Sequence, residues 1–149
     1  MNKTNNNINF LHIKEEEEIE NLPEDILNDA NNIYWHYISY VEDLSEDFIR
    51  EYADKLDLYW ISYKQTLSEN FIREFQNKVN WYWISEYQTL SEDFIREFKD
   101  RVNWVLISKY QTLSEDFIRE FEDEVYWIYI SEYQTLSEEF CKEFADRLK

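Results

Sequence analysis

Glycine is absent from the 149-residue sequence, which also contains only one proline (Pro23), one cysteine (Cys141) and two histidines. Loops that wrap phosphate groups depend on glycine, so a P-loop or a dinucleotide-binding turn of the usual kind is excluded. A single cysteine forms no internal disulfide, and with two histidines it does not make up a Cys/His zinc site. We therefore expect no cofactor and no metal, and we expect a binding or structural protein rather than an enzyme.

Positive charge is also scarce. The chain has 15 Lys and Arg residues against 33 Asp and Glu residues, which gives a formal net charge of -18 and a pI near 4.4. Such a surface repels phosphate groups, so direct binding to nucleic acid or to an anionic membrane is disfavoured. No uninterrupted apolar run is long enough for a membrane span, and the first ten residues lack the apolar core of a signal peptide. We expect a cytoplasmic protein.

Apolar residues are plentiful even so. Hydrophobic residues form 44% of the chain and aromatic residues 19%. A chain of this length and composition can bury a core and is not disordered throughout.

The main signal in the sequence is an internal repeat. Five units of 23 residues follow one another without insertion or deletion, and they begin at Trp35, Leu58, Trp81, Trp104 and Trp127. The third unit reads WYWISEYQTLSEDFIREFKDRVN. This strict register predicts a solenoid in which each unit packs only on its neighbours.

The first half of each unit conserves one helical face from unit to unit. In the third unit the constant residues are Trp81, Ile84, Ser85 and Gln88, which are spaced i, i+3, i+4 and i+7. This spacing predicts a short helix, and Asn80 before it is a favourable N-cap. A strand is the alternative, because segments such as WYWIS are short and rich in β-forming residues.

The second half predicts a helix from its capping residues. Glutamate follows three residues after a conserved threonine or aspartate, in the pattern of a capping box. The capping residues are Asp43, Thr66, Thr89, Thr112 and Thr135, and the glutamates are Glu46, Glu69, Glu92, Glu115 and Glu138. An apolar stripe through Phe94, Ile95, Phe98 and Val102 extends this helix in the third unit, where Glu97 and Arg101 have the spacing of an ion pair.

These patterns together predict an all-α solenoid of five short helix-turn-helix repeats with an N-terminal cap. The alternative is an α/β solenoid with one short strand per repeat. We divide the chain into a polar, acidic tail (1–20), a capping half-repeat (21–34) and the five-repeat solenoid (35–149).

Three sets of small or polar residues have structural interpretations. A glutamine recurs at the bend between the two helices, where its amide can satisfy backbone groups and bridge adjacent repeats. The recurring serine allows the helices to approach closely, and Cys141 lies on an apolar face, which predicts packing in the core. The glutamines are Gln65, Gln88, Gln111 and Gln134, and the serines are Ser39, Ser62, Ser85, Ser108 and Ser131.

The variable positions of the first helix are rich in aromatic residues. Stacked repeats would arrange them in columns, which would either fill a wider core or form an exposed ribbon for binding a protein. The candidates are Tyr59, Trp60, Tyr63, Tyr82, Trp83, Tyr87, Tyr110, Tyr129 and Tyr133.

The densest acidic stretch of the solenoid is a second candidate site. It consists of Asp100, Glu115, Asp116, Glu120, Glu122, Asp123 and Glu124. Carboxylates at a regular spacing on a compact acidic protein can occupy the basic groove of a nucleic-acid-binding protein.

The repeat resembles the W-x-x-I-S-x-x-Q-x-L-S-E-x-F-I-x-E-F repeats of uncharacterised proteins from phages and large DNA viruses. The best example is the segment from Trp81 to Phe98, and the resemblance covers residues 35–149. It implies a viral setting within a host cell but carries no active site. The function expected is inhibition of a basic host defence protein by nucleic-acid mimicry, as in anti-CRISPR or anti-restriction proteins. The alternative is a non-catalytic scaffold or self-assembly module whose aromatic residues form a homodimer contact.

Overall fold

The computed structural model describes residues 35, 38–40 and 43–148. The chain divides into two compact units, Met1–Asp57 and Leu58–Lys149. The first repeat belongs to the first unit, and the other four repeats form the second. The tail predicted at 1–20 and the half-repeat predicted at 21–34 lie outside the described residues.

The first unit contains the helical pair of the first repeat. Trp35 and residues 38–40 are helical, and α4 spans Glu46–Glu51. The rings of Trp35 and Tyr52 stack with their centroids 5.3 Å apart, and Phe48 and Ile49 are buried. The two halves of this repeat therefore share one small core.

The second unit is entirely helical within its described residues. Each repeat contributes a helix of seven residues and then one of six. The helices are α5 (Leu58–Lys64), α6 (Glu69–Glu74), α7 (Trp81–Tyr87), α8 (Glu92–Glu97), α9 (Trp104–Tyr110), α10 (Glu115–Glu120), α11 (Trp127–Tyr133) and α12 (Glu138–Glu143). The all-α fold is confirmed, and the strand alternative for the first half of the repeat is wrong.

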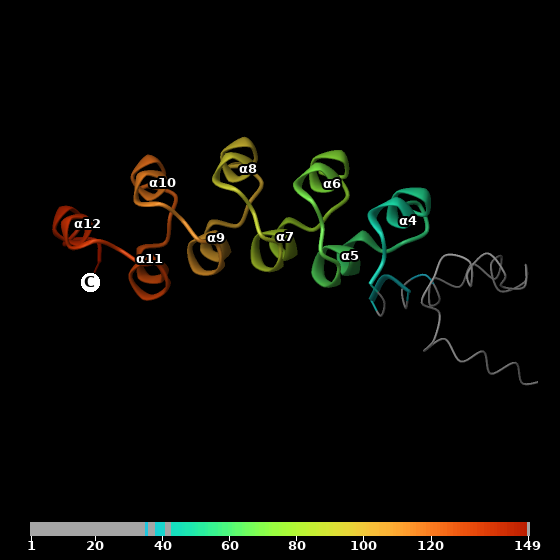
Figure 1. Cartoon of the computed structure of the whole chain (residues 1–149), viewed down its shortest axis with the longest axis horizontal. Helices are drawn as coiled ribbons and strands as arrows, with labels where there is room; N and C mark the ends of the chain where they lie inside the picture. The colour runs from blue at the N-terminus through green and yellow to red at the C-terminus, as the bar shows by residue number, and fades with distance from the viewer. Residues whose placement is uncertain (1–34, 36–37, 41–42, 149) are drawn as a thin grey trace, which may run out of the picture. The chain divides into compact units, whose positions relative to one another are not determined.

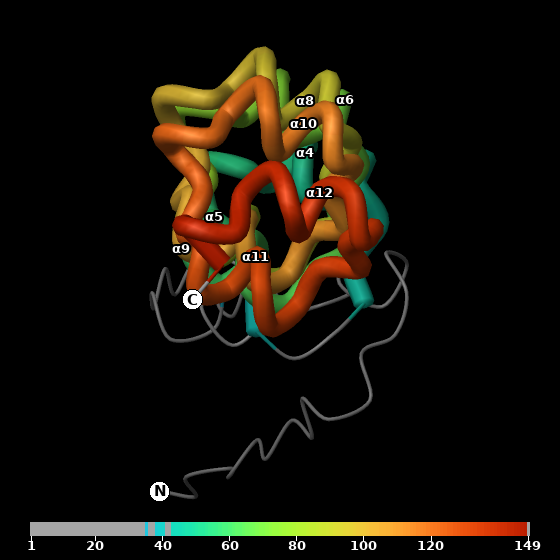
Figure 2. Tube along the Cα trace, turned by 90° about the vertical axis from the view of Figure 1, so that its left-hand side faces the viewer, coloured from blue at the N-terminus to red at the C-terminus, as the bar shows by residue number. Residues whose placement is uncertain are grey.

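Within the second unit the helices form two rows. The seven-residue helices α5, α7, α9 and α11 lie side by side in one row, and the six-residue helices occupy the other (Figure 1). Seen along the stack, successive helix pairs lie behind one another (Figure 2). This arrangement is the solenoid that the constant repeat length predicts.

The core of the stack lies between the two rows. Its fully buried side chains come from the same positions of each repeat, mainly a phenylalanine and two isoleucines. They are Phe71, Phe94, Phe117 and Phe140 with Ile61, Ile72, Ile84, Ile95, Ile107, Ile118 and Ile130. Helices this short are marginal in isolation, so contacts between repeats must supply most of the stability.

The seven-residue helices follow the predicted face. Ile84 and Ser85 of α7 are buried, and the Asn80 side chain accepts hydrogen bonds from Tyr82 N and Trp83 N at the helix start. Asn103 caps α9 in the same way, through Leu106 N. The predicted Asn80 cap is confirmed.

The N-caps of the six-residue helices are the serines, and the predicted threonine caps are wrong. In α8 the Ser91 hydroxyl accepts a hydrogen bond from Phe94 N at 3.2 Å, whereas Thr89 lies two residues earlier and is exposed. The glutamate is therefore the first helical residue, not the third. The Thr-x-x-Glu spacing fits a capping box, but the adjacent Ser-Glu pair fixes a later start. The capping serines are Ser45, Ser68, Ser91, Ser114 and Ser137.

The six-residue helices also end earlier than the apolar stripe suggests. Helix α8 stops at Glu97, and Phe98 and Val102 are buried through the turns that follow it. Because the helix has ended, the expected Glu97–Arg101 pair is wrong. Glu97 instead accepts a hydrogen bond from Arg73 Nε of the preceding repeat at 2.7 Å.

Candidate functional site

Within the second unit, glutamines connect the third, fourth and fifth repeats to the repeat before each of them. Gln88 Oε1 accepts a hydrogen bond from Leu67 N at 2.8 Å, and its Nε2 donates to the carbonyl oxygens of Ser62 and Gln65. Gln111 and Gln134 repeat this pattern one and two repeats further on. The structural interpretation of this row is confirmed.

The recurring serines serve as hydrogen-bonding groups as well as small residues. Ser85 is fully buried, donates to Trp81 O at 2.7 Å and accepts from Asn103 N at 2.9 Å. The hydroxyl thus ties one helix to the start of the next. Reasoning from the sequence considered only the size of this side chain, although a buried serine at a constant position also signals a hydroxyl with fixed partners.

The first glutamate of α6, α8 and α10 accepts a hydrogen bond from the backbone N–H of the capping serine in the next repeat. Glu92 Oε1 accepts a hydrogen bond from Ser114 N at 2.6 Å, and Glu115 accepts one from Ser137 N at the same distance. These hydrogen bonds, above all the one from the Ser137 backbone, lower the pKa of Glu115. Sequence reasoning assigned this glutamate to its own helix and missed the link between repeats.

Arginines form a further link between repeats along the row of six-residue helices. Arg96 Nε donates to Glu120 of the following repeat at 2.7 Å, and its guanidinium lies 5.0 Å from the ring centroid of Phe117. Arg119 contacts Glu143 and Phe140 in the same way. Each of these arginines therefore pairs with a glutamate of the following repeat.

Cys141 is exposed, so the prediction that it packs in the core is wrong. The isoleucines at its position in earlier repeats, Ile72, Ile95 and Ile118, are fully buried beneath the repeat that follows each of them. No described residue covers the corresponding face of the last repeat.

Six of the predicted aromatic residues form one cluster on α5 and α7. Trp83 lies at its centre, with ring centroids 4.8–5.8 Å from Tyr59, Tyr63, Tyr82 and Tyr87. Trp60 completes it through Tyr59 and Tyr63. The Trp83 indole nitrogen is buried without a hydrogen-bond partner, so ring packing holds it in place. We call these six residues the aromatic surface.

The aromatic surface is open to solvent at its edge. Tyr59, Tyr82 and Tyr87 are 42%, 47% and 50% exposed, so the rings neither belong wholly to the core nor project freely. Partial loss of water raises the pKa of Tyr87, and the neighbouring Glu86 carboxylate adds to that effect.

The remaining predicted aromatics gather around a lysine. Lys109 Nζ lies 4.8, 5.7 and 5.5 Å from the ring centroids of Tyr110, Tyr129 and Tyr133. A hydrogen bond with Tyr110 is the main cause that raises the pKa of Lys109. Helix α9 carries Val105 and a buried Leu106 at the positions that Tyr82 and Trp83 occupy in α7. The sequence analysis did not identify Lys109. The signal that could have found it is a basic residue beside tyrosines that recur from repeat to repeat.

The predicted acidic stretch is partly neutralised. Asp116 pairs with Arg119 at 3.0 Å, Glu120 with Arg96, and Asp123 with Arg147 at 3.6 Å. Asp100 and Glu124 are exposed, and Glu122 is half-buried. Asp123 and Glu124 line an open depression with Asn103, Trp104, Val105, Val125, Tyr126 and Trp127.

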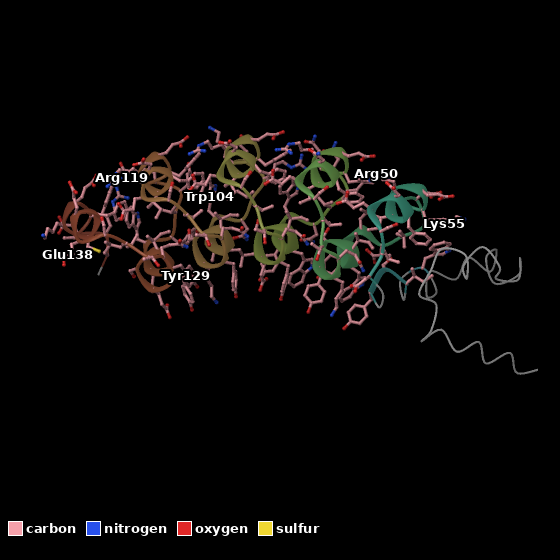
Figure 3. All side chains as sticks on the ribbon, in the orientation of Figure 1. Arg50, Lys55, Trp104, Arg119, Tyr129 and Glu138 are labelled. Carbon is pink, nitrogen blue, oxygen red and sulfur yellow. The ribbon has the colours of Figure 1, made fainter. Side chains whose placement is uncertain are left out.

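The aromatic and acidic candidates do not form one site. The predicted aromatic residues belong to the row of seven-residue helices, whereas Glu115, Asp116 and Glu120 belong to α10 in the other row. Figure 3 shows Tyr129 on α11 and Arg119 on α10 directed to opposite sides of the second unit. Glu115, Asp116 and Glu120 therefore do not border the aromatic surface.

The described residues contain no cluster of three or more His, Cys, Asp or Glu side chains that could hold a metal ion. None of their helices has the length and apolar character needed to cross a bilayer. Comparison of the chain with known protein families, with curated proteins and with solved structures finds no match.

Proposed function

We propose that this chain is a non-catalytic acidic repeat protein that binds a basic protein through the aromatic surface of α5 and α7. The observation that carries the proposal is the exposed edge of six clustered aromatic side chains on a chain of net charge -18. Tyrosine and tryptophan are the residues that most often anchor protein interfaces.

The contacts between Lys109 and tyrosine rings on the seven-residue helices support a basic partner. Lys109 already packs its ammonium against Tyr110 of its own helix and against Tyr129 and Tyr133 of α11. A lysine or arginine side chain of a partner can make the same contact with Tyr59, Tyr82 or Tyr87, and the negative charge of the chain speeds the encounter.

Nucleic-acid mimicry is the narrower candidate, in which the partner is a host defence protein that normally binds DNA or RNA inside the cell. One observation favours it. Asp93 and Asp116 recur at the same position of consecutive repeats, and their side chains are 94% and 96% exposed. A regular spacing of carboxylates can imitate a row of phosphates, although Arg96 and Arg119 lie between them and reduce the net charge.

A scaffold or homodimer is the second candidate. The same exposed rings favour it, because aromatic patches also mediate self-association. In that case the negative charge would serve solubility rather than recognition.

The test compares three forms of the full chain as bait in extract of the host cell, at low and at high salt. The forms are the unchanged chain, Tyr82→Ser in the aromatic surface and Tyr126→Ser in the acidic depression. The two tyrosines are matched, since they are 47% and 49% exposed. We expect one basic protein to bind the unchanged chain and Tyr126→Ser, to bind Tyr82→Ser at least about fivefold less, and to be released by salt.

The other outcomes separate the candidates. Release of the partner by added DNA or RNA, with binding that Tyr82→Ser leaves unchanged, would favour mimicry. Recovery of the chain alone, with Tyr82→Ser sedimenting as a monomer, would favour the homodimer. Binding that ignores both the substitutions and the salt would contradict the proposal.

A further inference from the structure

Three tryptophans, at the first position of the third, fourth and fifth repeats, are held by the same contacts. The indole Nε1 of Trp81, Trp104 and Trp127 donates a hydrogen bond to a carbonyl oxygen of the turn before its helix, at 2.9–3.0 Å. Each ring centroid also lies 4.9 Å from that of a phenylalanine of its own repeat. The three repeats therefore present the same tryptophan face to a neighbouring group.

In the third repeat that group is an arginine. The Arg101 guanidinium lies 5.3 Å from the centroid of the Trp81 ring. It donates to the carbonyl oxygen of Gln76 at 2.6 Å and to Asn77 Oδ1 at 3.2 Å. The Gln76 oxygen is the one that the Trp81 indole also bonds, so ring and guanidinium share an acceptor.

The fifth repeat has the same arrangement. The Arg147 guanidinium lies 5.6 Å from the centroid of the Trp127 ring. It donates to the carbonyl oxygen of Glu122 at 3.1 Å and pairs with the Asp123 carboxylate at 3.6 Å. Two repeats thus show how this fold binds a guanidinium group: with a tryptophan ring, a carbonyl oxygen and the polar side chain that follows it.

The fourth repeat has these binding groups but no arginine of its own. Glu124 stands where the third and fifth repeats have their arginine, and the binding groups are the Trp104 ring, the Lys99 carbonyl oxygen and Asp100. Among the described residues, no Lys or Arg side chain lies over Trp104 or pairs with Asp100 or Glu124. The hydrogen bond from Trp104 is exposed, whereas those of the other two tryptophans are partly buried.

We propose that Trp104, the Lys99 carbonyl oxygen, Asp100 and Glu124 bind an arginine side chain presented by another protein. We call these four groups the arginine site. Tryptophan is the ring that attracts cations most strongly, and a planar guanidinium stacks on it while its N–H groups donate to oxygen atoms at its edge. The two exposed carboxylates match its charge and can accept charge-assisted hydrogen bonds.

A second copy of this chain is the poorer source of that arginine. All six arginines of the sequence already bond to carboxylates or carbonyl oxygens of their own chain: Arg50, Arg73, Arg96, Arg101, Arg119 and Arg147. A copy would have to break one of these contacts, whereas a basic partner would not. That the partner is basic rests on the proposed function, but the arginine site shares no residue with the aromatic surface.

The test titrates the full chain with N-acetyl-arginine amide and follows the assigned indole N–H signals by nuclear magnetic resonance. The control probes are N-acetyl-lysine amide and N-acetyl-citrulline amide, which has the shape of the arginine probe without its charge. Trp81 and Trp127 are internal controls, because arginines of the chain already bind there. Glu124→Arg supplies the fourth repeat with an arginine, and Glu132→Arg makes the same change of charge at an exposed residue of α11.

We expect the arginine probe to shift the Trp104 signal saturably, at least about fivefold more than the signals of Trp81 and Trp127. The lysine probe should bind at least about threefold more weakly, because an ammonium lacks the planar stacking face of a guanidinium. The citrulline probe should give no saturable shift. Glu124→Arg should abolish the response of Trp104, and Glu132→Arg should retain it.

Three results would overturn the proposal. The first is no saturable shift of the Trp104 signal with the arginine probe. The second is an equal shift at all three tryptophans, and the third is a response that Glu124→Arg leaves unchanged. A failed titration would remove the arginine site alone, whereas a partner that binds the unchanged chain and Tyr82→Ser equally would remove the aromatic surface alone.

Discussion

A single glutamine side chain makes three hydrogen bonds between neighbouring repeats. Gln88 is 4% exposed and satisfies one N–H and two carbonyl oxygens of the preceding repeat. A buried polar group without its partner costs about 1–3 kcal/mol. We expect Gln88→Leu to lower the free energy of unfolding by about 2–4 kcal/mol, measured by urea denaturation.

Gln134→Leu is the control for that variant. Gln134 makes the same three hydrogen bonds but is half-buried, so water can replace the lost amide. We expect a loss of less than about half that of Gln88→Leu. Equal losses would mean that shape, rather than hydrogen bonding in a dry site, determines the effect.

The link from Glu115 to Ser137 predicts a dependence on pH. Hydrogen bonds from Ser137 lower the pKa of Glu115 in the folded state, so its contribution to stability is present above the ordinary glutamate pKa of about 4.3. That contribution is lost as the pH falls through the lowered value. We expect Glu115→Gln to be less stable than the unchanged chain at pH 7, with the difference shrinking at acid pH, in thermal melts followed by circular dichroism.

Glu138→Gln serves as the matched control, because the Glu138 side chain is 95% exposed and no described residue of another repeat gives it an N–H to accept. Its melting temperature should follow that of the unchanged chain at every pH. A difference for Glu115→Gln that stays constant down to acid pH would show that the carboxylate charge is not involved.

At the residue scale, exact recurrence predicted which positions matter, and burial explained why. The sequence pattern predicted a bridging role for the glutamines because an amide at a bend has few other uses. It did not predict the partners of Ser85 or Glu92, since their partners depend on how the helices are placed. Cys141 was misjudged because its apolar face is only buried where another repeat follows.

At the scale of the element, the N-cap contributes a large share of the hydrogen bonds of each short helix. Helix α8 has six residues, and Ser91 satisfies one of its free N–H groups. Loss of a serine cap typically costs about 1 kcal/mol. We therefore expect Ser91→Ala to destabilise the chain by about 1 kcal/mol and Thr89→Ala, two residues earlier and exposed, to have an effect near zero in urea denaturation.

This pair also tests where α8 begins. A larger loss for Thr89→Ala than for Ser91→Ala would restore the capping box that the sequence suggested. The sequence could not decide between the two, because threonine and serine are both good caps and the glutamate suits either register. The structure separates them through the hydrogen bond from Phe94 N.

The existence and type of the helices were easier to predict than their ends. The spacing of Trp81, Ile84, Ser85 and Gln88 indicated a helix despite many β-forming residues, because the constant positions mark a helical face. The apolar stripe through Val102 suggested too long a second helix. Turns can bury the same residues as a helix, and so Phe98 and Val102 are buried beyond the end of α8.

At the scale of the whole molecule, the candidate aromatic residues lie on the seven-residue helices, and Glu115, Asp116 and Glu120 of the acidic stretch lie on a six-residue helix. The repeat length predicted this separation in principle, since each position recurs every 23 residues. The pairing of Arg96 with Glu120 was not predictable from charge counts, because these residues are 24 positions apart and meet only when the repeats stack. The aromatic surface and the acidic stretch are consequently two candidate sites rather than one.

Net charge decides the last prediction, which concerns salt. The chain carries 33 acidic and 15 basic residues. We therefore expect the repulsion among carboxylates to destabilise the fold more than the Arg–Glu links between repeats stabilise it. Salt screens both, but exposed ion pairs contribute little, about 0–1 kcal/mol each, whereas the excess negative charge acts on the whole fold. We expect the melting temperature to rise between about 10 mM and about 200 mM NaCl. Arg96→Gln, which removes one link and leaves the carboxylates, should melt lower and gain more from the salt. A melting temperature that falls with salt would instead mean that the ion pairs between repeats outweigh the repulsion. Contacts between the six-residue helices would then depend mainly on these ion pairs.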